Sequence, residues 1–220
     1  MANATPAGYL RNNAWLGDDV LAAHESQSTE SDIEILAESG THIAHCPASG
    51  SRGGFHRAAN MPSIVDAGVN VALGTDNMSE DMFEALKFGM ALGRGRRGDR
   101  ARPTPGEMLD AATLNGAKAI GREADLGSLE VGKQADLILV NLRRPNMTPV
   151  ISLLSNLVHY GQAGNVETVM VAGRILMQDG ELMTMNEQDV LRNAQEATIS
   201  AWKRLSELYP DVPAMEPSPW

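Results

Sequence analysis

An apolar run that stops at a carboxylate is the feature that most constrains this chain. Residues 69–75 read Val-Asn-Val-Ala-Leu-Gly-Thr, and Asp76 follows directly. The run predicts a buried strand, and the polar residues after it lead into a helix. A carboxylate at a strand end can bind a metal ion or accept a proton from bound water. It can also be the N-cap of the next helix, so Asp76 alone leaves both interpretations open.

Two earlier segments have the same organisation. Residues 20–23 form a short apolar run that ends at His24, and residues 41–46 form a second strand that contains His45 and stops at Pro47. Strands that alternate with helices are typical of a parallel sheet with crossover helices, and in a βα-barrel the strand ends point at the active site. We therefore expect an α/β fold that is a partial (β/α)8 TIM-type barrel, because three such units cannot close eight strands.

Several local signals predict where helices and loops lie. Ser31 and Glu34 have the spacing of a capping box, and Thr104 and Glu107 repeat it ahead of a helix that we expect to run to about residue 120. A helix is also expected from residue 80 to about 92. The small residues 48–54 and the basic residues 94–102 are interpreted as loops.

The character of the chain changes after Gly121. Residues 137–140 predict a strand, and two further strands flank Ala172-Gly173, which is typical of a tight hairpin. A last amphipathic helix is expected from about residue 187 to 208. We therefore divide the chain into part of a barrel (1–122), a small β domain (123–185), and a C-terminal helix and tail (186–220).

Charge and cysteine content restrict the partners and the compartment. The formal net charge is −10, which disfavours nucleic acid and anionic membranes, since both require clustered cations. Cys46 is the single cysteine, so an intrachain disulfide is impossible and a reducing compartment is expected. The first residues have no signal-peptide pattern and no apolar run is long enough to cross a bilayer, so we expect a cytoplasmic protein.

The histidines are the remaining candidates for chemistry. His24, at a strand end, can exchange a proton with a bound substrate or be held by the backbone in a structural role. His42 and His45 lie three residues apart on one strand and therefore face opposite sides; we expect His45 to face the barrel mouth. His56 is interpreted as a loop residue without a role in the chemistry, and His159 as a structural residue. A catalytic metal needs three or more protein ligands, and the chain has no His-x-His pair, so its metal site is expected to be incomplete.

The order of these motifs resembles the amidohydrolase superfamily. The motifs are Ala-Ala-His at 22–24, Ile-Ala-His-Cys-Pro-Ala-Ser at 43–49 and Ala-Leu-Gly-Thr-Asp at 72–76. They are most similar to the branch of aminohydrolases and chlorohydrolases that act on triazines, guanine, cytosine and adenosine-like compounds. Residues 111–117, 126–137 and 169–174 resemble that branch's post-barrel helix, the entry to its small β domain and its closing hairpin.

The resemblance implies a divalent metal, zinc or iron, whose bound hydroxide attacks a carbon that carries an amino or halide leaving group. In the family, a His-x-His pair on the first strand, a histidine on the fifth and an aspartate on the eighth hold the metal. By position, Asp76 matches that aspartate, which is both metal ligand and proton acceptor. His24 matches the catalytic histidine that polarises the substrate. His45 and Ser49 match the segment that lines the mouth, which implies substrate binding.

The departures from the family pattern are equally specific. The His-x-His pair, the fifth-strand histidine and the catalytic glutamate have no counterpart, so the chain resembles the C-terminal half only. Gly50 replaces a common asparagine, and residues 77–81 differ from the usual sequence, which leaves the substrate class open.

We therefore expect the C-terminal portion of an enzyme that deaminates a small-molecule heterocycle by hydrolysis of a non-peptide carbon–nitrogen bond, inactive as this chain alone. The alternative is a non-catalytic half-barrel that needs a partner chain. A cyclic amide hydrolase similar to imidazolonepropionase or dihydroorotase is a third possibility. Unpaired strand edges favour association, either as a homo-oligomer or with the missing N-terminal half.

Overall fold

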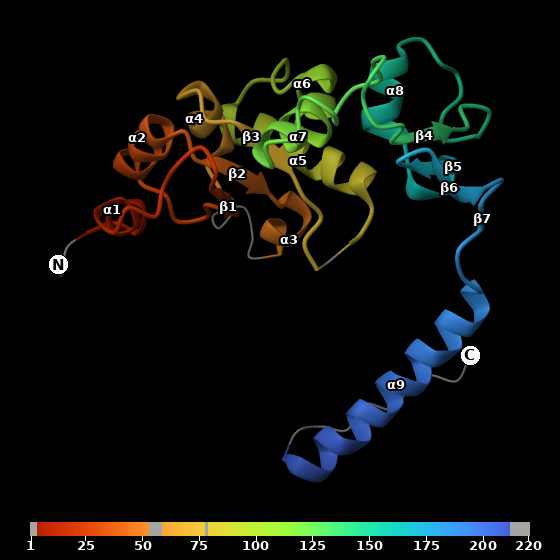
Figure 1. Cartoon of the computed structure of the whole chain (residues 1–220). Coiled ribbons are helices and arrows are strands. Elements are labelled where there is room, and N and C mark those ends of the chain that lie inside the picture. Colours follow the sequence, from red (N-terminus) through yellow and green to blue (C-terminus); the bar gives the residue numbers. More distant parts are fainter. Residues whose placement is uncertain (1–3, 53–58, 78, 212–220) are drawn as a thin grey trace.

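The computed structural model describes residues 4–52, 59–77 and 79–211. Its first sheet is parallel and has the order β1 (Leu21–Ala23), β2 (His42–His45), β3 (Val71–Leu73). The connections are helical, with α2 (Glu30–Ser39) between the first two strands, and α3 (Pro47–Ser51) and α4 (Met61–Asp66) between the last two (Figure 1). The α/β fold with a partial barrel is confirmed, and in the described residues the sheet does not close.

The two faces of this sheet differ in burial. Ile43 pairs with Val71 and His45 with Leu73, so these four side chains share one face. Ile43 is 0% exposed and lies in a core with residues of α2 and α4. On the opposite face, Leu21 of β1 is 43% exposed. One face therefore carries the helices, and the other corresponds to the interior of a barrel.

Helix α2 begins at a different capping box from the predicted one. The Thr29 side chain accepts a hydrogen bond from the Asp32 backbone N–H, and Asp32 Oδ2 accepts one from the Thr29 N–H at 3.0 Å. Asp32 also accepts from the Ala7 N–H at 3.0 Å and so attaches α1 (Pro6–Asn12) to α2. The Ser31–Glu34 prediction was wrong because Thr29 and Asp32 have the same spacing and Asp32 is the buried member.

Two segments predicted as loops are helical. Residues 47–51 form α3, with Pro47 in the first turn, where its fixed φ suits a helix. Helix α5 (Met82–Arg97) continues past residue 92 and ends at Gly98, whose φ is +67°. The physical reason is an ion pair, since Arg97 donates to both carboxylate oxygens of Asp66 on α4, at 2.8 and 2.9 Å.

The helix predicted after Thr104 begins as expected but breaks at Thr113. The Thr104–Glu107 capping box is present, and the two pieces are α6 (Pro105–Ala112) and α7 (Leu114–Ala119). Asn115 of α7 donates from Nδ2 to the Val71 carbonyl at 2.9 Å, and Asn70 donates to the Asn115 carbonyl at 3.1 Å. The change of direction at Thr113 therefore accompanies the hydrogen bonds that hold α7 against β3. Helix propensity alone does not predict these contacts.

The second sheet is antiparallel, in the order β4 (Leu137–Val140), β5 (Val166–Val171), β6 (Arg174–Gln178), β7 (Glu181–Leu182). The hairpin at Ala172-Gly173 is confirmed, because both residues have positive φ, +48° and +78°, as a type I′ turn requires. Helix α8 (Leu153–Tyr160) and the short 3₁₀ helix η2 (Ala163–Asn165) lie between β4 and β5.

The predicted C-terminal helix is α9 (Glu187–Leu208), which extends away from both sheets (Figure 1). None of its 22 residues is buried. Among the described residues, no helix is both long and apolar enough to span a bilayer.

Candidate active site

His24 and Asp76 lie side by side at the ends of β1 and β3. His24 Nε2 is 3.7 Å from Asp76 Oδ2, although the residues are far apart in the sequence. Strand β2 lies between β1 and β3, so the two side chains approach each other across its end. The side chains are 43% and 28% exposed, which leaves both accessible to a small molecule.

The backbone at both positions is in the left-handed region. The φ angles are +68° at His24, +52° at Glu25 and +58° at Asp76. Each such non-glycine residue costs on the order of 1–3 kcal/mol and persists only where the surroundings enforce it. Regular strand alternation would place His24 on the helix-covered face with Ala22, and the left-handed residues interrupt that alternation. Strain at both strand ends is typical of functional sites.

Asp76 is held in its charged form. A hydrogen bond from the Ser49 hydroxyl is the main influence that lowers the pKa of the Asp76 carboxyl below its usual range. Partial burial opposes this effect, while the Asn77 backbone N–H and the positive charge of His24 add to it. An ionised carboxylate beside an imidazole can bind a cation or accept a proton at neutral pH.

Ser49 reaches Asp76 because residues 47–51 are helical. Helix α3 places the Ser49 hydroxyl on the carboxylate of Asp76, and the predicted substrate-binding role of Ser49 stays a prediction. Sequence reasoning missed this contact because the segment was interpreted as a loop. The capacity of Pro47 to start a helix was the signal that could have revealed it.

The expected orientations of His42 and His45 were wrong. His45 lies on the face of Ile43 and Leu73, under the helices, and is 8% exposed. Burial lowers the pKa of His45 to about 4, with a smaller contribution from the charge of His24. His42 lies on the opposite face, 6% exposed, and its Nδ1 has no hydrogen-bond partner in the described residues. The substrate-binding role of His45 stays a prediction, which this placement does not favour.

The other sequence candidates are structural or fall outside the description. Cys46 is 9% exposed, and burial raises the pKa of its thiol, with Asp76 adding to the effect. A Cβ at Gly74 would lie 3.1 Å from Cys46 Sγ, so the thiol fills space beside a glycine. His159 is an exposed residue of α8 whose ring is 6.1 Å from that of Tyr160. His56 lies outside the described residues.

The metal implied by the sequence resemblance has an incomplete set of ligands here. Across residues 4–52, 59–77 and 79–211, no group of three or more His, Cys, Asp or Glu side chains is arranged to hold an ion. Asp76 and His24 supply two polar groups, whereas a catalytic zinc takes three protein ligands and a water. The described residues therefore do not fit a complete catalytic metal site.

Sequence comparison identifies deaminases as relatives. A 5-methylthioadenosine/S-adenosylhomocysteine deaminase of Moorella thermoacetica is 39% identical over 191 residues, covering 85% of this chain and 44% of that protein. A 5'-deoxyadenosine deaminase of Methanosarcina mazei is 37% identical over 192 residues, with 86% and 44% coverage. The chain thus spans less than half the length of these curated relatives.

Solved structures give the same result for the fold. A zinc-bound adenosine deaminase from Xanthomonas campestris superposes with a TM-score of 0.81 at 32% identity, covering 86% of this chain and 44% of that one. A zinc-bound atrazine chlorohydrolase from Arthrobacter aurescens gives 0.75 at 26% identity, with 86% and 43% coverage. The model of the family described as Amidohydrolase family matches residues 5–176, and with these relatives it shows that the chain belongs to the amidohydrolase family.

Proposed function

We propose that the complete protein hydrolyses a carbon–nitrogen bond of a small heterocycle, in the manner of an adenosine-type deaminase. The observation that carries this proposal is the approach of His24 to Asp76 across the end of β2. Relatives named as deaminases of 5-methylthioadenosine and 5'-deoxyadenosine support an adenine derivative as the substrate class. They favour deamination over cyclic amide hydrolysis.

Each residue of the site has a proposed role. Asp76, ionised at neutral pH, provides one carboxylate ligand for a divalent metal and can accept a proton. His24 lies close enough to hydrogen-bond a substrate held at that carboxylate. Ser49 orients Asp76. Zinc is favoured over iron because solved relatives carry zinc.

We also propose that this chain alone is not a catalyst. Its described residues do not complete a metal site, and its matches cover only 44% of the relatives' length. The missing ligands then come from a further segment or a partner chain, either an N-terminal half or another copy. The same incompleteness favours the second candidate function, a non-catalytic half-barrel module. The domain boundaries at 122/123 and 185/186 and a cytoplasmic location are part of the proposal.

A chimera tests the proposed function directly. In it, the 191 residues of this chain that align with the M. thermoacetica deaminase replace the matching part of that enzyme, and ammonia release from 5-methylthioadenosine is measured. We expect activity in the chimera and none in the chain alone. Asp76→Asn and His24→Ala should each reduce kcat by at least about 100-fold, a typical loss for a removed catalytic group.

Asp110→Asn is the matched control, because it removes an exposed carboxylate of α6, outside the strand ends that carry His24 and Asp76. It should leave kcat within about twofold of the parent chimera, as expected of a surface change. A chimera that folds and remains fully active with Asp76→Asn would show that this carboxylate has no catalytic role. Ammonia release by the chain alone would refute its assignment as an incomplete catalyst.

A further inference from the structure

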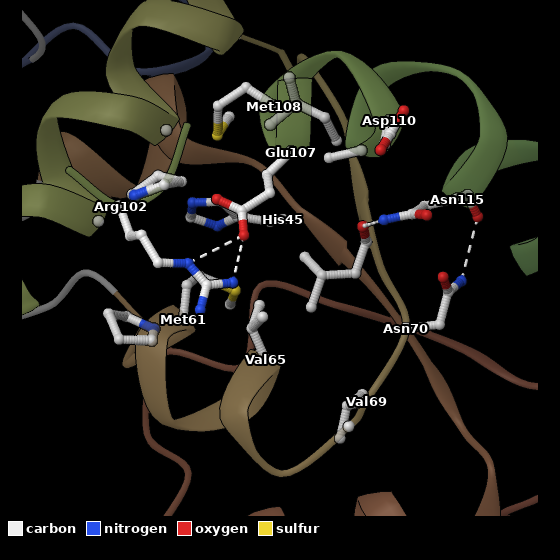
Figure 2. A pocket seen from close by; sticks show the side chains of 18 of the residues that line it. His45, Met61, Val65, Val69, Asn70, Arg102, Glu107, Met108, Asp110 and Asn115 are labelled. Atoms are coloured by element: carbon white, nitrogen blue, oxygen red, sulfur yellow. Dashed lines mark hydrogen bonds and ion pairs between the residues drawn. The ribbon is translucent and has the colours of Figure 1, made fainter. Parts of the chain in front are cut away.

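A cavity of about 360 Å³ lies on the helix-covered face of the first sheet, between β3 and the helices α4, α5, α6 and α7. His45 lines it, together with Met61 of α4 and Met108 of α6 (Figure 2). Its size falls within the usual range of small-molecule sites. Neither His24 nor Asp76 lines this cavity.

The imidazole of His45 is the main evidence that the cavity accepts a ligand. His45 is 8% exposed, and its side chain makes no hydrogen bond with any residue in the described part of the chain. Among the described residues only His42 Nδ1 is a fully buried side-chain atom without a partner, so the unbonded His45 nitrogens remain accessible to solvent or to a molecule in the cavity. The pKa of His45, lowered to about 4, keeps the ring neutral at pH 7. It therefore offers one N–H donor and one nitrogen acceptor to the cavity.

The walls favour an apolar, flat ligand. Three valines, one leucine and two methionines line it together with two prolines and an alanine, and thioethers make favourable contacts with aromatic rings. Two glycines of α5, Gly89 and Gly93, bring that helix close to the opposite wall. A Cβ at Gly89 would lie 2.6 Å from Met108 Cε, and one at Gly93 would lie 2.9 Å from Pro103 Cδ.

The charges around the cavity cancel in pairs. Arg102 donates to Glu107, with Nε 3.0 Å from Oε1, and Figure 2 shows this pair beside His45. Arg97 is held by Asp66, which leaves Asp110 and Lys118 as the remaining charges, one of each sign. Such a rim gives neither an anion nor a cation a clear advantage, so a neutral ligand is favoured.

We propose that this cavity binds a neutral, flat aromatic heterocycle that carries one hydrogen-bond donor and one acceptor, with His45 as its polar anchor. The proposal is independent of the deaminase function, because it uses neither His24 nor Asp76.

Benzimidazole is a suitable probe, since it is flat, neutral at pH 7.5 and has one donor and one acceptor. It is titrated into the 220-residue chain labelled with ¹³C at the methionine methyl groups. We expect the Met61 and Met108 signals to shift with a Kd of roughly 1 mM or tighter, typical of a ligand of this size. The signal of Met147, which is buried outside the cavity, should not move. Shifts confined to other methionines, or no shifts, would overturn the proposal.

Matched ligands and variants distinguish a hydrogen bond to His45 from occupation of the cavity by apolar contacts alone. Indene has the same shape without nitrogen and should bind about tenfold more weakly, the effect of one net hydrogen bond. His45→Leu should weaken the binding of benzimidazole by a similar factor and leave the affinity for indene unchanged. His45→Gln keeps a donor and an acceptor, so it should bind benzimidazole as the parent chain does. Equal affinities for both ligands, unaffected by His45→Leu, would refute the role of His45.

Two further variants fix the location. Ala111→Phe should fill the cavity and abolish the shifts, whereas Ala91→Phe, on the exposed side of α5, should not. His24→Ala should leave benzimidazole binding intact, and loss of binding in that variant would place the ligand at Asp76 instead. If Ala111→Phe does not fold, the Leu and Gln variants at position 45 and the indene comparison still decide the question.

Discussion

The buried imidazole of His45 makes the stability of this protein depend on pH. In the folded chain its pKa is lowered to about 4, mainly by burial, from an ordinary value of 6.5. The unfolded chain therefore binds a proton on His45 in a pH range where the folded chain does not. The neutral ring favours the folded state above pH 6.5, and this contribution is lost as the pH falls from 6.5 towards 4.

The size of the effect follows from the two pKa values. Each pKa unit corresponds to about 1.4 kcal/mol, so the full difference is roughly 3 kcal/mol. Between pH 6.5 and 5 the loss should be about 2 kcal/mol. Since His45 is only 8% exposed, solvent screens this effect little. A loss of this size is a large fraction of the stability of an ordinary domain.

Urea unfolding followed by far-UV circular dichroism at pH 7, 6.5, 6, 5.5 and 5 measures the effect. The free energy of unfolding of the parent chain should fall across this range, and His45→Gln, which cannot titrate, should remove about 2 kcal/mol of that fall. Met108→Leu is the control, since it changes the same cavity but keeps His45. It should shift stability by a constant amount at every pH.

The difference in pH dependence between the parent chain and His45→Gln decides whether the His45 imidazole is responsible. If His45→Gln loses stability with decreasing pH as steeply as the parent chain, the imidazole is not the group responsible, and its assigned burial is wrong. Other groups that titrate in this range contribute equally to both chains, so they cancel in the difference.

Two local substitutions provide further tests by the same unfolding assay at pH 7. Thr104→Ala removes the side chain that caps the Glu107 N–H and should lower stability by about 1 kcal/mol, and an unchanged midpoint would contradict the role of the cap. Gly161→Ala would place a Cβ against the Leu157 carbonyl oxygen and 2.6 Å from Phe83 Cδ1, and should cost about 1–3 kcal/mol. Gly164→Ala, with no atom within 4 Å of its new Cβ, should cost clearly less.

The parallel half-barrel could be predicted from sequence because each strand carries its own local signals. Short apolar segments that end at His24, near His45 and at Asp76 alternate with helix signals, and the structure has parallel strands at these places. The Ala172-Gly173 hairpin was equally predictable, since turn chemistry is local.

The two errors in helix extent, at the end of α5 and at Thr113, concern long-range contacts. The length of α5 depends on the Arg97–Asp66 ion pair, and the break at Thr113 accompanies the attachment of Asn115 to β3. Neither contact is visible in local sequence.

The site shows the same division between local and long-range information. His24 and Asp76 were identified from their positions at strand ends, and the structure places them 3.7 Å apart. The directions of His42 and His45 were predicted incorrectly, because alternation shows that two residues face opposite sides without showing which side is covered by helices. Ile43 and Leu73 settle that point through their packing in the core.

Zinc content is the most direct test of the central claim, that Asp76 and His24 form only part of an amidohydrolase metal site. The purified chain is dialysed to equilibrium against micromolar zinc, then against a weak chelator, and bound metal is measured by mass spectrometry. We expect well below one zinc per chain after the chelator step. One tightly held zinc per chain that disappears in Asp76→Asn would contradict the account, because it would require a complete site within these 220 residues.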